Sequence, residues 1–314
     1  MRRALLRLGG VLCLGAGASA SLAAQPAQSA RPACQPVHFA PLSALDKTLD
    51  MGVFLIHYTT RGEHAVASLA DKNDNGTPDV VDDLALQLKV ANELYSGVIG
   101  LRPPLQQPRY KAAQHINIYV LDIKGNGQAF DEVVSERIRG KNEACGLRVY
   151  IDHKVTPSRN LTPAHELFHL YQYGYAMFKA SWYLEGMARW VESFFKPSKP
   201  AGQAAAKRHI SCDQVYAKSY AASAYWLQQG LAGGGSAQAV PAKLQAQRYV
   251  GGSAAITAKQ FQGGGFLLRT MQALEAASAK ATKAENLAPY GWPEKRQRSS
   301  DFNELICATT VAKK

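Results

Sequence analysis

The stretch from Ala164 to Tyr173 reads AHELFHLYQY, and it carries two histidines four residues apart, with a glutamate directly after the first. On an α-helix, positions i and i+4 are separated by about 400°, so His165 and His169 point the same way, one turn apart. Thr162, followed by proline, predicts the N-cap of this helix, and Gly174 predicts its end. Two imidazoles placed in this way can bind one tetrahedral zinc ion.

Glu166 lies beside these histidines on the helix, where it can accept a proton from a zinc-activated water rather than bind the metal. A catalytic zinc takes three protein ligands and leaves the fourth position for water. Gln172 and Tyr175 stand where an extended His-x-x-Gly-x-x-His pattern needs Gly and His, so that pattern supplies no third ligand. Glu185, near the start of a second helix predicted over 182–195 and capped by Ser181, is the expected third ligand.

The pattern His165-Glu166-x-x-His169, followed by Glu185-Gly186-x-Ala188-x-Trp190, resembles the gluzincins, the thermolysin-like branch of the zinc metallopeptidases. More narrowly, it is similar to exported bacterial metalloproteases that have an Asp/Asn-rich loop upstream. The resemblance covers roughly residues 53–195 in motif order. It implies a zincin-like fold, zinc held by His165, His169 and Glu185, and Glu166 as general base.

The resemblance also implies an oxyanion-stabilising Tyr or His from a later helix, for which Tyr220 is the candidate and Tyr225 the rival. The pattern departs from the family at Arg189, where thermolysin-like enzymes have an Asp that orients a histidine. Glu192, a turn further along the same face, is the candidate to take over that role.

A second ion is expected upstream, in the segment 71–82, which reads DKNDNGTPDVVD. Oxygen side chains stand at loop positions 1, 3, 5, 9 and 12 with glycine at position 6, which is the spacing of a calcium loop. The residue at position 7 offers its backbone carbonyl. The expected calcium ligands are Asp71, Asn73, Asn75, Thr77, Asp79 and Asp82.

Three segments rich in β-forming residues predict strands, at 53–58, 116–121 and 147–152. A helix is predicted from Pro78 to about Gly97, and further helices around 214–229 and 266–279. Strands early in the chain and helices late predict an α+β fold, with a small N-terminal sheet, the helix of the His pair, and a mainly helical C-terminal half.

The chain begins with arginines, an apolar run and small residues, a pattern typical of a Sec-type signal peptide over residues 1–24. Residues 25–50 are expected to be a flexible lead-in or a pro-segment, and residues 51–314 the metallopeptidase domain. The protein is thus expected to be secreted or periplasmic. No later stretch reaches about 18 apolar residues, so no membrane-spanning helix is expected.

Removal of the signal peptide leaves four cysteines in a chain routed to an oxidising compartment. Two disulfides are expected, and the sequence leaves all three pairings open among Cys34, Cys145, Cys212 and Cys307.

The formal net charge of +12 comes from scattered Lys and Arg residues, with one small cluster at 295–298. Basic residues do not form a stripe interleaved with aromatics, so a nucleic-acid partner is not expected. The sequence therefore predicts a calcium-stabilised zinc metallopeptidase acting on a protein or peptide substrate. The alternative is a calcium-stabilised secreted binding or adhesion protein that has a zincin scaffold without turnover.

Overall fold

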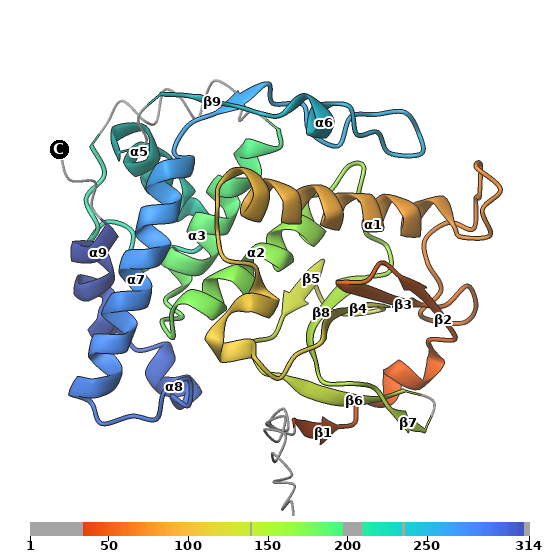
Figure 1. Ribbon diagram of the computed structural model, residues 1–314, viewed down its shortest axis with the longest axis horizontal. Helices are drawn as coiled ribbons and strands as arrows, with labels where there is room; N and C mark the ends of the chain where they lie inside the picture. The colour runs from red at the N-terminus through yellow and green to blue at the C-terminus, as the bar shows by residue number, and fades with distance from the viewer. Residues whose placement is uncertain (1–33, 139, 197–208, 234–235, 311–314) are drawn as a thin grey trace, which may run out of the picture. The chain divides into compact units, whose positions relative to one another are not determined.

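The computed structural model describes residues 34–138, 140–196, 209–233 and 236–310, and their fold is α+β (Figure 1). A curled mixed sheet is formed by β1 (Gln35–Val37), β2 (Lys47–Asp50), β3 (Phe54–Tyr58), β4 (His115–Leu121), β5 (Gly127–Ala129), β6 (Val134–Ile138), β7 (Lys141–Asn142) and β8 (Gly146–Asp152). The longer helices are α1 (Asp79–Asn92), α2 (Thr162–Tyr175), α3 (Ser181–Val191), α5 (Ser223–Gly233), α7 (Gly264–Ala284) and α9 (Asn303–Thr310).

Short elements complete the fold. Two small helices are α6 (Ala242–Gln245) and α8 (Glu294–Gln297), and two short strands, β9 (Gln238–Ala239) and β10 (Gln260–Phe261), pair with each other. The π-helix η2 (Glu93–Val98) prolongs α1. Single 3-10 turns are η1 (Ala40–Ala44), η3 (Pro104–Gln106), η4 (Pro108–Tyr110), η5 (Glu192–Phe194), η6 (Tyr220–Ala222) and η7 (Ser300–Phe302).

The three strands predicted from the sequence form the centre of the sheet. The strand order is β1-β6-β8-β4-β3-β2, with β3, β4 and β8 parallel to one another. Each begins within one residue of its predicted start. Both β2 and β5 pair antiparallel, β2 with β3 and β5 with β8.

The two faces of the sheet follow the alternation of side chains along each strand. In β4, Ile116, Ile118 and Val120 join the core that α1 and α2 cover, whereas Tyr119 and Leu121 belong to a second cluster on the opposite side. In that second cluster the strands pack against Leu42 of η1 and against Leu45, which directly follows η1. One face therefore carries the helices, and among them α2.

The sheet also corrects the expected boundary at residue 50. Residues 35–50 form β1, η1 and β2, and both strands pair within the main sheet, so this part of the expected lead-in belongs to the folded domain. A strand needs a hydrogen-bonded neighbour, which no local sequence pattern identifies. The expected signal peptide and the remainder of the lead-in lie outside the described residues.

Two disulfides are present, as expected, and the structure selects their pairing. Cys34 is bonded to Cys145, which precedes β8, and Cys212 is bonded to Cys307 in α9. They join residues 111 and 95 positions apart.

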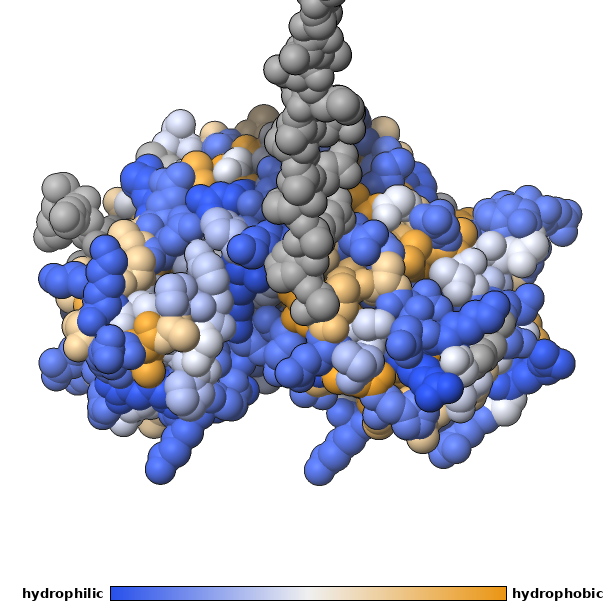
Figure 2. Space-filling view, turned by 60° about the horizontal axis from the view of Figure 1, so that its bottom comes forward, coloured by the Kyte–Doolittle hydropathy of each residue, from blue (hydrophilic) through white to orange (hydrophobic). Residues whose placement is uncertain are grey.

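On the face shown in Figure 2, most described residues are hydrophilic, and hydrophobic residues lie in small patches between them. Large hydrophobic side chains that are exposed are scattered along the chain: Phe39, Val53, Leu69, Tyr220, Leu231 and Tyr290. Within the described ranges, none of the helices has the length and apolar character needed to cross a membrane.

Candidate metal centre

The helix α2 is buried along almost its whole length, which holds its side chains in fixed directions. Thr162 is the first helical residue rather than the expected N-cap, and Leu161 occupies the cap position. The side chain of Asn160, two residues before Thr162, accepts hydrogen bonds from the start of the helix. The Oδ1 atom of Asn160 accepts hydrogen bonds from the backbone N–H and the hydroxyl of Thr162, at 2.8 and 2.7 Å. Gly174 lies inside the helix, which ends one residue later at Tyr175.

The helix α3 brings Glu185 to α2. It begins at Ser181, which is again the first helical residue, because Ala180 holds the cap position. The Ser181 hydroxyl donates to Ser219 Oγ at 3.0 Å. A Cβ atom added to Gly186 would lie 2.6 Å from Cβ of Ala222. Glycine thus allows α3 to lie close against η6, directly beside Glu185.

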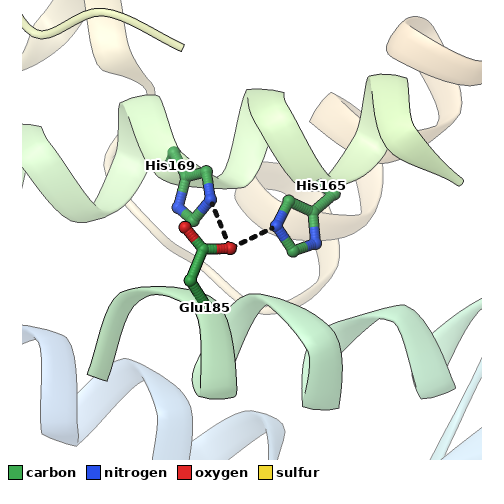
Figure 3. A group of neighbouring side chains, drawn as sticks. All are labelled: His165, His169 and Glu185. Atoms are coloured by element: carbon green, nitrogen blue, oxygen red, sulfur yellow. Dashed lines mark hydrogen bonds and ion pairs between the residues drawn. The ribbon is translucent and has the colours of Figure 1, made fainter. Parts of the chain in front are cut away.

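The side chains of His165, His169 and Glu185 converge between the two helices (Figure 3). Oε2 of Glu185 lies 3.1 Å from Nε2 of His165 and 3.5 Å from Nε2 of His169. The three ligand atoms all lie within 4.8 Å of one another. Both histidines are buried, whereas the glutamate is partly exposed.

Gln172 orients His169, a role that the sequence analysis did not assign. Its Nε2 donates to the backbone carbonyls of Tyr183 and Leu184, so its Oε1, 2.8 Å from Nδ1 of His169, is the atom that faces the ring. An amide oxygen only accepts, so Nδ1 of His169 carries the proton. The position three residues after a candidate ligand on the same helix is the signal that could have indicated this residue.

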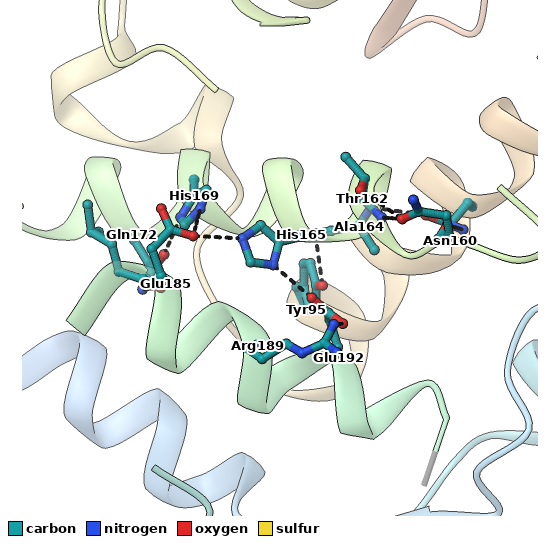
Figure 4. A network of polar contacts seen from close by, with 12 residues as sticks. Tyr95, Asn160, Thr162, Ala164, His165, His169, Gln172, Glu185, Arg189 and Glu192 are labelled. Atoms are coloured by element: carbon teal, nitrogen blue, oxygen red, sulfur yellow. Dashed lines mark hydrogen bonds and ion pairs between the residues drawn. The ribbon is translucent and has the colours of Figure 1, made fainter. Parts of the chain in front are cut away.

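Glu192 orients His165 in the same way (Figure 4). Its Oε1 lies 2.9 Å from Nδ1 of His165, and its Oε2 accepts from the guanidinium of Arg189. A carboxylate accepts hydrogen bonds, so the Nδ1–H of His165 donates to it. Figure 4 also shows why α3 supplies both contacts: α2 and α3 run antiparallel, so Glu185 lies against both His165 and His169, and Glu192, further along α3, lies beside Nδ1 of His165.

This protonation pattern makes the site suitable for a cation. With Nδ1 donating to its partner, each imidazole turns Nε2 toward the carboxylate oxygen of Glu185, and these three atoms repel one another unless a proton or a cation lies between them. Burial alone would lower the pKa of His165, but its hydrogen bonds with Glu185 and Glu192 raise that pKa to about 9. Burial would raise the pKa of Glu185, yet its contacts with both histidines hold it well below its usual value. The donor set of two nitrogens and one oxygen fits zinc.

Glu166 is buried beside this group, and the structure does not place it among the converging ligand atoms. It faces β5, where a Cβ atom added to Gly127 would lie 2.7 Å from Cγ and 2.9 Å from Oε1 of Glu166. Burial raises the pKa of Glu166, an effect that the nearby His169 and His165 oppose. A raised pKa brings a carboxylate closer to the range in which it exchanges protons.

Tyr220, on η6, lies at the same site, whereas its rival does not. The ring centroids of Tyr220 and His165 are 5.7 Å apart. Burial and the charge of Glu185 raise the pKa of Tyr220 to about 12, so the hydroxyl retains its proton. Tyr225 is only 1% exposed and contacts Cys212 in the core.

The candidate metal centre opens into a cleft with a volume of about 720 Å³, here called the site cleft. Its sides come from the segment around β5, from the loop before α2, and from α3 with η5 and η6. The lining residues are Gly125, Asn126, Gly127, Arg159, Asn160, Leu161, Thr162, His165, Glu166, Arg189, Glu192, Ser193, Lys196 and Tyr220.

The loop of residues 71–82, which includes the first turn of α1, folds back on itself. The carboxylate of Asp71 accepts from the backbone N–H groups of Asn75 and Gly76, at 3.1 and 2.8 Å. The side-chain amides of Asn73 and Asn75 both donate to Oδ2 of Asp82, at 3.1 and 2.9 Å. Three of the expected calcium ligands therefore meet at one point, and a carboxamide can present its oxygen there as well as its nitrogen.

The remaining expected calcium ligands lie at the end of the same loop. Oδ1 of Asp79 accepts from the backbone N–H of Lys72 at 2.8 Å, and the backbone N–H of Thr77 donates to the side chain of Asn75. Gly76 has a φ of 82°, a left-handed conformation that favours glycine. The loop is thus turned at the glycine predicted from the spacing.

A second group with metal-binding side chains comprises Asp122, Asp152 and His153. Here internal partners already satisfy the carboxylates. Lys154 Nζ lies 3.2 Å from Oδ1 of Asp122, and the backbone N–H groups of Ile123 and Lys154 donate to the two oxygens of Asp152. This group is a weaker metal candidate than the one between α2 and α3, because the Lys154 ammonium and two backbone N–H groups already bind its carboxylate oxygens.

Comparison with known proteins finds no match among family models, curated proteins or solved structures. A functional assignment therefore rests on the residues of the site.

Proposed function

We propose that this chain is a secreted zinc-dependent metallopeptidase of the gluzincin type, with a zincin-like fold. One observation carries the proposal: two imidazoles with protonated Nδ1 atoms direct Nε2 toward a single carboxylate oxygen, 3.1 and 3.5 Å away, at the side of an open cleft. His165, His169 and Glu185 would hold the ion. When bound, zinc supplies a Lewis acid that lowers the pKa of water and polarises a peptide carbonyl.

Glu166 has the position and environment of a general base. It is buried next to the ligand group without belonging to it, and its raised pKa suits a carboxylate that accepts a proton from water and then returns it to the leaving amine. The contact of its side chain with Gly127 limits the directions in which the carboxylate can turn. Tyr220, with its proton retained, is placed to donate a hydrogen bond to the oxyanion.

The cleft has an edge suited to an extended peptide. β5 pairs with β8, and Gly127 of β5 lines the cleft. An extended chain can add to such an edge through backbone hydrogen bonds, which recognise a peptide irrespective of its side chains. This supports a protein or peptide substrate over a small molecule.

A structural calcium in the loop of residues 71–82 belongs to the proposal. The side chains of Asp71, Asn73, Asn75, Asp79 and Asp82 and the backbone carbonyl of Thr77 would bind it. The loop leads directly into α1, which packs on α2. Calcium would therefore stiffen the helix pair that carries the histidines.

The test compares wild-type protein with Glu166→Gln, a nearly isosteric change that removes the base. Metal content is measured on both proteins, and cleavage of a denatured protein substrate is followed with and without a chelator. Glu63→Gln, on the exposed surface, is the matched control. We expect one zinc per chain in all three proteins, chelator-sensitive cleavage by wild type and by Glu63→Gln, and a loss of at least a hundredfold in Glu166→Gln.

The outcomes distinguish a peptidase from a binding or adhesion protein. A wild-type protein that binds zinc fully but cleaves no substrate would favour the alternative, a binding or adhesion protein. Absence of bound zinc in the wild type would refute both the ligand set and the peptidase.

A further inference from the structure

The site cleft contains two positive side chains that the proposed chemistry does not use. Three cationic residues line the cleft, and one of them, Arg189, is paired with Glu192. Arg159 and Lys196 form no ion pair with a carboxylate among the described residues. Every Asp and Glu of the chain lies within the described ranges, so no acidic side chain elsewhere is left to neutralise them.

Lys196 contacts the loop that carries Arg159. Nζ of Lys196 is 3.4 Å from the backbone carbonyl of Ser158, the residue directly before Arg159. The Arg159 side chain is exposed and that of Lys196 is half-buried. Arg159 lies in the loop between β8 and α2, and Lys196 lies just after η5.

The start of α2 increases the positive potential there. Residues 159–162 of the cleft wall lead into the N-terminus of this helix, where the backbone dipoles place partial positive charge. By contrast, the acidic residues of the cleft are engaged: Glu192 holds His165 and Arg189, and Glu166 is buried against β5. A substrate carboxylate beside residues 159–162 would meet positive charge without a competing negative partner.

We propose that Arg159 and Lys196 bind a carboxylate of the substrate, so that the protein prefers acidic peptides. This inference rests on the peptidase proposal for the identity of the ligand as a peptide substrate. The contact between the two cationic side chains and a carboxylate does not depend on cleavage. A guanidinium and an ammonium together suit a carboxylate, because the first offers a planar pair of donors and the second a mobile point charge. The carboxylate has two sources, an Asp or Glu side chain near the cleaved bond or the free C-terminus of a short peptide.

The first experiment measures kcat/KM of zinc-loaded protein on fluorogenic peptides that differ only by Glu or Gln at one position, scanned across the cleaved bond. Each peptide is made with a free and with an amidated C-terminus. We expect at one position a preference for Glu of roughly tenfold or more, the effect of one hydrogen bond to a charged group. Faster cleavage of peptides with a free C-terminus than of amidated ones, with Glu and Gln peptides cleaved equally, would assign the carboxylate to the peptide end.

Variants assign the preference to the residues. Arg159→Gln and Lys196→Gln should each lower the Glu-to-Gln ratio several-fold, and Arg159→Lys should restore part of it. Lys47→Gln on β2, which removes the same charge outside the cleft, is the matched control and should leave the ratio unchanged. Thermal melting of every variant verifies folding. Equal ratios in Arg159→Gln, Lys196→Gln and wild type would overturn the inference.

A binding arm makes the inference independent of turnover. The labelled Glu and Gln peptides are titrated by fluorescence anisotropy with Glu166→Gln protein at low and high salt. Tighter binding of the Glu peptide, weakened by salt, supports the carboxylate site even if the wild type cleaves nothing. Equal binding of both peptides, or binding of neither, overturns it, whereas cleavage by the wild type without preference leaves the peptidase proposal standing.

Discussion

Replacement of Glu192 tests whether the contacts around the ligands tune the candidate metal centre. In Glu192→Leu, His165 loses the carboxylate that holds its Nδ1–H at 2.9 Å, and the imidazole can rotate or change tautomer. The Glu192 side chain is only 14% exposed, so water cannot fully replace the contact. A hydrogen bond to a charged group contributes about 1.5–3 kcal/mol, which corresponds to a loss of zinc affinity of roughly 10- to 100-fold.

The assay is competition for zinc against a chromophoric chelator of known affinity, at fixed pH. Glu192→Gln keeps an acceptor oxygen and should lose less affinity than Glu192→Leu. Arg189→Gln is the control, because it removes the ion pair with Glu192 but leaves the contact between Glu192 and His165, and Arg189 is itself 57% exposed. We expect at most a few-fold change in this control. Unchanged zinc affinity in Glu192→Leu, or an equal loss in Arg189→Gln, would refute the role of Glu192.

Three further predictions concern the cleft, the zinc-free protein and the disulfide of the sheet. Gly127→Ala places a methyl group against Glu166, so turnover should fall by about 10- to 100-fold while zinc content is retained; undiminished activity in a peptide assay would contradict the contact. In zinc-free protein, the His165 pKa of about 9 lies above its ordinary value of 6.5, so protonated His165 stabilises the folded state. This contribution to the free energy of unfolding is complete below pH 6.5 and is lost as the pH rises to about 9. Melting curves across that window should show the decline, and His165→Asn should abolish it. Replacing Cys34 and Cys145 by serine opens a loop closed over 111 positions and should lower the free energy of unfolding by about 4–5 kcal/mol in urea titrations, with a negligible change arguing against the bond.

Much of the fold and of the candidate site follows from short-range patterns. The i, i+4 spacing of His165 and His169 places them on one side of α2 wherever that helix lies, and the β-branched runs predict β3, β4 and β8 to within one residue at their starts. The even number of cysteines predicts two disulfides. These predictions succeed because helix and strand periodicity depends on residues close in the chain.

The helix ends were predicted less well. Thr162 and Ser181 are first helical residues rather than caps: the Asn160 side chain accepts from the backbone N–H of Thr162, and α3 begins after Ala180 without a side-chain cap. The same limit applies to residues 35–50, which join the sheet through partners far away in the sequence.

The site itself was decided by packing between α2 and α3. Their antiparallel arrangement sets Glu185 and Glu192 against His165, and it brings the carbonyls of α3 to Gln172, whose orientation then determines the tautomer of His169. The pairing of the cysteines and the approach of Tyr220 depend on long-range packing in the same way. Periodicity along one helix states which residues share a face, but the partner of that face depends on the burial of apolar surface between distant segments, which only the folded chain decides.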